Sequence, residues 1–141
     1  MIDDELEAWS ASERQKVMDY LRKQEGLTHG AVGDWPAWRL ATRISVWAVE
    51  SVRSPGAIGW WVICGDLPTD YCSGGPDCRI PRAAVGKLVQ RWRDALSQYR
   101  DGDPTIGDLG IQGEFAPLLR TRVEALSELL ADDANWPDEP F

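Results

Sequence analysis

The stretch that decides the fold is residues 42–64, which read TRISVWAVESVRSPGAIGWWVIC. Its first part, residues 42–53, is rich in β-branched residues and alternates, with Ile44, Val46, Ala48 and Val52 on one face, which predicts a strand. Proline and glycine at Pro55 and Gly56 then favour a type II turn, because proline fixes φ and glycine accepts a positive φ. The sequence therefore predicts an antiparallel hairpin.

The second arm of this hairpin, residues 57–64, is apolar on both faces. A strand with one side in water alternates instead, so we expect this arm to be covered on both sides or to carry a partner surface. After a turn at residues 65–68, residues 69–72 are expected to form a short third strand.

Three helices are predicted around this sheet, over residues 13–24, 81–100 and 114–131. The first follows a Ser-x-x-Glu capping box at Ser10 and Glu13, although the acidic residues before it can form another helical turn. The other two carry apolar stripes with helical spacing and a proline near their start.

The fold class that follows is α+β, with a small antiparallel sheet centred on the tryptophan-rich hairpin at about 42–64 and packed by these helices. We expect residues 1–141 to form a single globular domain, because 141 residues bury only one core. Residues 132–141 are predicted to be an irregular acidic tail.

The composition limits the environment and the partners. With 43% hydrophobic residues and no apolar run near the ~20 residues that a bilayer requires, no membrane span is expected. A net charge of −8 repels nucleic acids and anionic membranes. The acidic start, residues 3–7, is unlike a secretory signal, so the expected location is cytoplasmic.

The groups that commonly carry chemistry are sparse. The only histidine, His29, lies in a glycine-flanked loop without a nucleophile motif, and no phosphate-binding glycine pattern occurs, so we expect no cofactor. The spacing of Cys64, Cys72 and Cys78 is unlike that of zinc ligands, so we expect no metal and three free thiols. Cys72 and Cys78 can close a short loop if they are oxidised.

Two aspartates, Asp66 and Asp70, keep an enzymatic alternative open. Paired acids support acid/base catalysis when burial separates their pKa values, and together with Tyr71 they suggest an uncharacterised acid-assisted enzyme. The same spacing fits aspartates that accept backbone hydrogen bonds in a turn. We favour the turn and predict that the protein is not an enzyme.

Residues 79–100 carry six basic residues against one acid, Asp94. Such a segment can orient an anionic partner, contact the acidic ends of the same chain, or simply present a solvated helix face, which is the interpretation we favour.

Several of these segments resemble the bacterial proteins grouped as domain of unknown function 4826. The resemblance rests on the run ISVWAVES at residues 44–51, the run GWWVICGDLPTDY at 59–71, the run PAWRL at 36–40 and the basic helix. It implies a shared fold and carries no activity and no catalytic residues.

For function, we expect a small acidic, non-catalytic protein that binds a protein partner, such as a toxin or effector, as an immunity protein or antitoxin. Eight tryptophans and strong acidity suit aromatic anchors with steering charges. The candidate partner-binding residues are Trp35, Trp38, Trp136, Asp34, Asp132 and Asp133. The alternative is a small-ligand-binding domain with an aromatic pocket. Anchors should be exposed in the monomer, whereas pocket residues should be enclosed.

Overall fold

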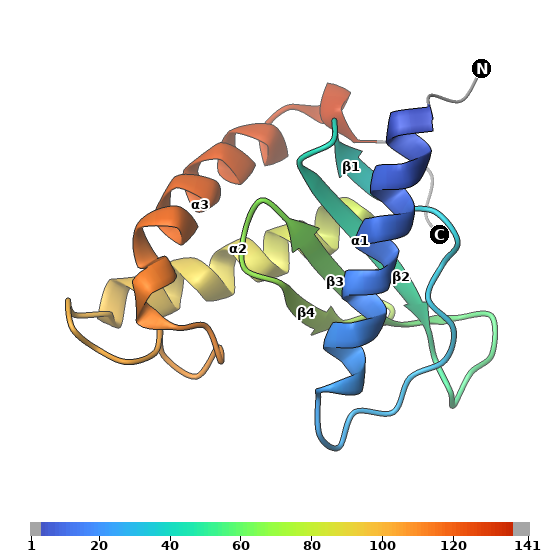
Figure 1. Ribbon diagram of the computed structural model, residues 1–141, viewed down its shortest axis with the longest axis horizontal. Helices are drawn as coiled ribbons and strands as arrows, with labels where there is room; N and C mark the ends of the chain where they lie inside the picture. The colour runs from blue at the N-terminus through green and yellow to red at the C-terminus, as the bar shows by residue number, and fades with distance from the viewer. Residues whose placement is uncertain (1–3, 137–141) are drawn as a thin grey trace.

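A computed structural model describes residues 4–136 of the chain (Figure 1). The three α-helices in this part are α1 (Asp4–Arg22), α2 (Pro81–Gln98) and α3 (Ala116–Leu130). The strands are β1 (Trp38–Leu40), β2 (Ile44–Glu50), β3 (Ile58–Gly65) and β4 (Asp70–Ser73). They form one antiparallel sheet in the order β1-β2-β3-β4, so the predicted α+β class is confirmed.

The hairpin of β2 and β3 forms the centre of the sheet. Its turn closes with a 2.9 Å hydrogen bond from the Ala57 amide to the Ser54 carbonyl, and Gly56 takes a φ of +89°, as the type II prediction requires. The register shifts between Val49 and Glu50, and β2 ends at Glu50. The expected continuation of the strand is therefore wrong, and Val52 is 58% exposed.

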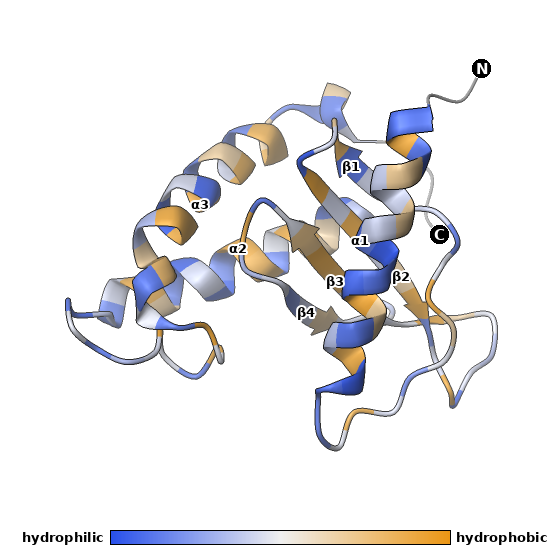
Figure 2. Cartoon of the chain, viewed as in Figure 1, coloured by the Kyte–Doolittle hydropathy of each residue, from blue (hydrophilic) through white to orange (hydrophobic). Residues whose placement is uncertain are grey.

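Both faces of this hairpin are buried, so the sheet is the middle layer of three. Helix α1 crosses one face, while α2 and α3 cover the other (Figure 1). Strands β2 and β3 accordingly carry apolar residues along most of their length (Figure 2). Trp47 and Val62 face α1, whereas Val46, Trp61 and Ile63 face α2 and α3. The expectation of a single apolar face on the first arm is wrong, because α1 covers its second face.

Helix α1 begins at Asp4, so the predicted start at residue 13 is wrong. The helix continues through Ser10 and Glu13, and both side chains are buried. The Ser-x-x-Glu pattern is therefore part of a packed helical face and caps nothing. Helices α2 and α3 begin and end within about two residues of their predicted bounds.

The short strand β1 was not predicted from the sequence. Ala41 follows it with a φ of +45°, and the Arg43 amide bonds to the Leu40 carbonyl at 2.9 Å, which reverses the chain into β2. A 3₁₀ turn, η1 (Gly113–Phe115), precedes α3 and another, η2 (Asp133–Asn135), follows it. Residues 137–141 of the predicted irregular tail lie outside the described part of the chain.

In the part of the chain that the structure describes, no helix is long and apolar enough to cross a membrane.

Candidate functional site

A groove of about 840 Å³ follows the outer edge of the sheet at β4. Helix α1 forms one wall, α2 forms the other, and the loop at residues 107–110 closes one end. We call it the aromatic groove. The residues that line it are Tyr20, Gln24, Trp60, Asp70, Tyr71, Cys72, Ser73, Arg91, Asp94, Ala95, Gln98 and 107–110.

Three aromatic rings from three elements meet in this groove. The Tyr71 ring lies 6.0 Å from that of Tyr20 and 5.6 Å from that of Trp60, and both pairs are edge-to-face. All three side chains are partly exposed. The Trp60 indole donates to the Thr28 carbonyl at 3.0 Å, which fixes its orientation. The groove therefore offers aromatic surface that is already ordered before anything binds.

The tyrosine hydroxyls in the groove have no hydrogen-bond partner among residues 4–136, whereas nearby polar groups do. Burial raises the pKa of Tyr20, and the negative charge of Asp70 raises it further. Tyr20 thus keeps its proton at neutral pH and can donate a hydrogen bond to an incoming group.

Asp70 organises the floor of the groove. Its carboxylate accepts 2.8 Å hydrogen bonds from Arg91, from the indole of Trp92 and from the Tyr71 amide. Arg91 also donates to the Tyr71 carbonyl at 2.6 Å, and Lys87 donates to the Ser73 carbonyl at 3.1 Å. These side chains occupy the Tyr71 amide and the Tyr71 and Ser73 carbonyls, which the edge strand would otherwise offer to another chain.

The rim of the groove is acidic. Asp94 and Asp108 are exposed there, and Asp94 accepts a 2.9 Å hydrogen bond from Gln90. Asp70 matches the charge of Arg91, and Lys87 at Ser73 offsets one of the two rim carboxylates, so the site keeps one net negative charge.

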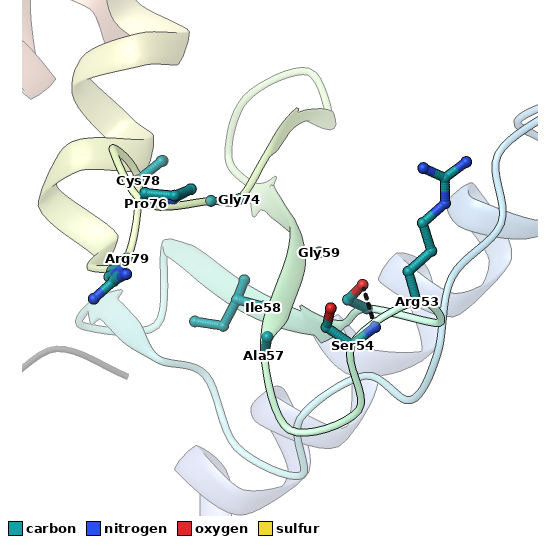
Figure 3. A pocket seen from close by; sticks show the side chains of 11 residues that line it. Arg53, Ser54, Ala57, Ile58, Gly59, Gly74, Pro76, Cys78 and Arg79 are labelled. Atoms are coloured by element: carbon teal, nitrogen blue, oxygen red, sulfur yellow. Dashed lines mark hydrogen bonds between the residues drawn. The ribbon is translucent and has the colours of Figure 1, made fainter.

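A second groove, of about 580 Å³, lies beside the β2–β3 turn and the loop that follows β4 (Figure 3). Ala57 and Ile58 lie between two exposed arginines, Arg53 on one side and Arg79 on the other. Cys78 borders this groove next to Arg79. The arginines stand far apart in the view and do not converge on one point.

The three tryptophans proposed from the sequence as anchors differ in exposure. Trp35 is 47% exposed, as an anchor should be. Trp38 and Trp136 are only 8% and 6% exposed, because their rings stack on each other at 4.4 Å with their indoles bonded to main-chain carbonyls. They hold the end of the described chain against β1, so the expectation of exposure is wrong for both.

The three candidate steering aspartates are exposed, but each has a neighbour within its own chain. Asp34 lies 3.9 Å from Arg14, Asp132 accepts from the Ala134 amide, and Asp133 pairs with Arg82 at 2.7 Å. The last contact joins the basic helix to the acidic end of the chain. None of these three, and none of the three tryptophans, lines the aromatic groove.

The acid pair considered for catalysis is divided between two ion pairs. Asp66 is half-exposed and binds Arg122 at 2.6 Å, with Arg43 at 3.5 Å, whereas Asp70 is buried and binds Arg91. Asp70 accepts the Tyr71 amide as the first residue of β4, whereas the Asp66 carboxylate accepts from arginines and from no backbone amide among residues 4–136, so the expected turn interaction is wrong for Asp66. His29 is bonded to the neighbouring Gly30 carbonyl.

The three cysteines are free thiols and are all buried. Cys64 lies on the α1 face beside Ser45 and Glu13, while Cys72 and Cys78 lie on the α2 face, where the Cys72 thiol donates to the Ala84 carbonyl at 3.9 Å. Burial raises the pKa values of Cys64 and Cys72 to about 12. Within residues 4–136, no three potential metal-binding side chains come together.

Sequence reasoning did not identify Trp60, Arg91 and Asp108 as groove residues. The available signal was the second hairpin arm, whose two apolar faces suggested either full cover or a partner surface. Trp61 is buried, whereas Trp60 on the opposite face is partly exposed, so one face of this arm is not fully covered. Residues 107–110 line the groove because their loop folds back toward β4. No local sequence pattern predicts that path.

The family model described as Domain of unknown function (DUF4826) matches residues 4–136. No curated protein and no solved structure matches the chain.

Proposed function

The chain belongs to the family Domain of unknown function (DUF4826), and from the geometry of its aromatic groove we propose that it is a non-catalytic protein that binds a basic segment of a protein partner. The observation that carries this proposal is the cluster of Tyr20, Trp60 and Tyr71 in an open groove with an acidic rim. Aromatic anchors of this kind provide much of the binding energy at protein interfaces.

The chemistry of the groove favours a cationic side chain. A lysine or arginine can lie against the aromatic faces and also pair with Asp94 or Asp108. The net charge of −8 would accelerate the approach of such a partner. Because Arg91 and Lys87 occupy the carbonyls of the edge strand, we expect recognition through side chains rather than through strand addition.

The open form of the groove supports a protein over a metabolite. Small-molecule sites typically enclose 70–90% of their ligand, which a groove along a sheet edge does not do. Within the class of protein-binding proteins, we propose an immunity protein or antitoxin, because acidic inhibitors suit basic toxins. The groove residues replace Trp38 and Trp136 as the proposed anchors.

Affinity capture from the native host tests this function. The tagged protein is compared with an Asp94→Asn/Asp108→Asn variant and with an Asp77→Asn/Asp101→Asn control, which removes equal charge outside the aromatic groove. We expect one protein partner whose affinity falls at least tenfold in the groove variant only. Equal binding by both variants would contradict the groove, and a partner that is instead a small amine, detected by native mass spectrometry, would establish the ligand-binding alternative.

A further inference from the structure

The three rings of the aromatic groove stand at steep angles to one another. The Tyr71 ring is inclined by 61° to that of Tyr20 and by 71° to that of Trp60, with the centroids 6.0 and 5.6 Å apart. The rings come from α1, β3 and β4, and all three line the same groove. Because their planes are not parallel, one rounded group in the groove can contact more than one ring.

The acidic side chains of the groove belong to its α2 side. Asp70 and Tyr71 are neighbours in β4, so their side chains point to opposite faces of the sheet: Tyr71 packs under α1, and Asp70 is bonded to α2. Asp94 lies on α2, and the loop that carries Asp108 packs against α2 where Gly107 lies beside Ala95. A cation that lies among all three rings, unlike one at the rim, therefore has no unpaired carboxylate beside it.

We propose that the group which enters this ring cluster is the trimethylammonium group of a methylated lysine in the protein partner. This inference rests on the proposed function and names the side chain that the groove selects. An unmodified ammonium has three N–H donors, which are costly to take out of water where no acceptor replaces it. A trimethylammonium group donates no hydrogen bond and keeps its positive charge, which aromatic faces attract.

The acidic rim has a separate role toward the same segment. Asp94 and Asp108 suit unmodified lysines or arginines that flank the methylated residue, because a close ion pair uses an N–H donor. The rings themselves are ordered in advance: the Trp60 indole is bonded to the Thr28 carbonyl, and Asp70 holds the Tyr71 amide. Binding therefore costs little loss of side-chain freedom in the groove.

Matched peptides test this inference with the full chain. Each is a short arginine-flanked peptide whose central residue is lysine, trimethyllysine or the neutral analogue in which a tert-butyl group replaces the trimethylammonium group. Dissociation constants are measured by NMR titration, with choline as a fourth probe. We expect the trimethyllysine peptide to bind at least about tenfold more tightly than the other two peptides and than choline.

Variants of the full chain locate the effect. Trp60→Leu removes one ring of the cluster and should abolish most of this preference, whereas Trp35→Leu removes an exposed ring outside the groove and should leave it unchanged. Tyr20→Phe keeps the ring and removes only the hydroxyl, so the preference should persist. Asp94→Asn/Asp108→Asn should weaken the binding of all three peptides and leave their ratio unchanged.

The outcomes separate this inference from the proposed function. Equal affinity for the three peptides, all weakened by Asp94→Asn/Asp108→Asn, would overturn the methylated lysine and leave the binding of a basic segment intact. A preference for trimethyllysine that survives Trp60→Leu would overturn its assignment to the ring cluster. Choline that binds as tightly as the trimethyllysine peptide would overturn the assignment to a protein side chain.

Discussion

Asp70 is the residue on which the order of the aromatic groove depends. It is only 3% exposed, yet it satisfies the Arg91 guanidinium, the buried Trp92 indole and the Tyr71 amide together. Turn propensity alone suggested that this aspartate would accept a backbone amide, and one of its bonds does so. Its two other partners are about twenty residues further along the chain in α2, so they could not be inferred from local sequence.

Replacing Asp70 with asparagine tests this network. Asp70→Asn keeps the size of the side chain but removes the charge, so we expect the free energy of unfolding to fall by about 2 kcal/mol. The half-exposed Asp66 is the matched control, and Asp66→Asn should cost under about 1 kcal/mol. Both values are measured by urea denaturation. Equal losses would show that the Asp70 contacts contribute no more than a surface ion pair.

Among the helices, strands and turns, the sequence predicted those whose sequence patterns lie within one short segment. The periodicity of α2 and α3 and the turn at Pro55 and Gly56 each reside in one short segment, and the structure places these elements as expected. Strand β1 has only three residues and no such pattern. It exists because it pairs with β2 and because Trp38 stacks on Trp136, almost a hundred residues away.

The Ser-x-x-Glu pattern at Ser10 and Glu13 is compatible with two structures, a capped helix start and the interior of a longer helix. Ser10 and Glu13 match a capping box, but the acidic segment before them is itself helical, and both side chains face inward. The Ser10 hydroxyl is buried without a hydrogen-bond partner, and Glu13 pairs with Lys16 at 2.8 Å. The Ser-x-x-Glu pattern can be read from four neighbouring residues. The burial of this part of α1 depends on strands β2 and β3, which lie more than thirty residues further along the chain.

Ser10→Ala distinguishes the two structures. As a cap, Ser10 would contribute about 1 kcal/mol, and its loss would destabilise the protein. In the interior of α1, the substitution removes an unpaired buried hydroxyl and adds a better helix former, so we expect a gain of about 1 kcal/mol in the free energy of unfolding. The exposed Ser12 on the same helix is the control, and Ser12→Ala should gain only about half as much.

The stack of Trp38 on Trp136 joins the end of the described chain to the edge of the sheet. Because Trp136 is buried, Trp136→Ala should lower the free energy of unfolding by about 3 kcal/mol. Trp35→Ala removes an exposed ring and should change it by less than about 0.5 kcal/mol. Thermal or chemical unfolding of both variants measures the difference. A small effect at Trp136 would mean that the end of the chain contributes little to the core.

On the scale of the whole molecule, the sheet separates two hydrophobic clusters, one under α1 and one under α2 and α3. Titratable groups are buried in both: Cys64 in the first cluster, and Cys72 and Cys78 in the second. Because buried thiols lie on both faces of the sheet, both clusters make the free energy of unfolding depend on alkaline pH.

The sign of that dependence follows from the raised thiol pKa values. Burial moves the pKa values of Cys64 and Cys72 from 9.0 to about 12, so above pH 9 the unfolded chain loses these protons while the folded protein retains them. Stability is then complete below the unfolded pKa and falls as the pH rises, by about 1.4 kcal/mol per pH unit for each thiol. We expect Cys64 and Cys72 together to lower the free energy of unfolding, measured in urea with reductant present, by roughly 2–3 kcal/mol between about pH 8 and about pH 10. The raised pKa values of Cys78 and Tyr20 act in the same direction. Cys64→Ala should remove about 1.4 kcal/mol of the drop between these pH values. An equal drop in the variant would contradict the assignment, because the Cys64 proton would then contribute nothing to the difference between the folded and unfolded states.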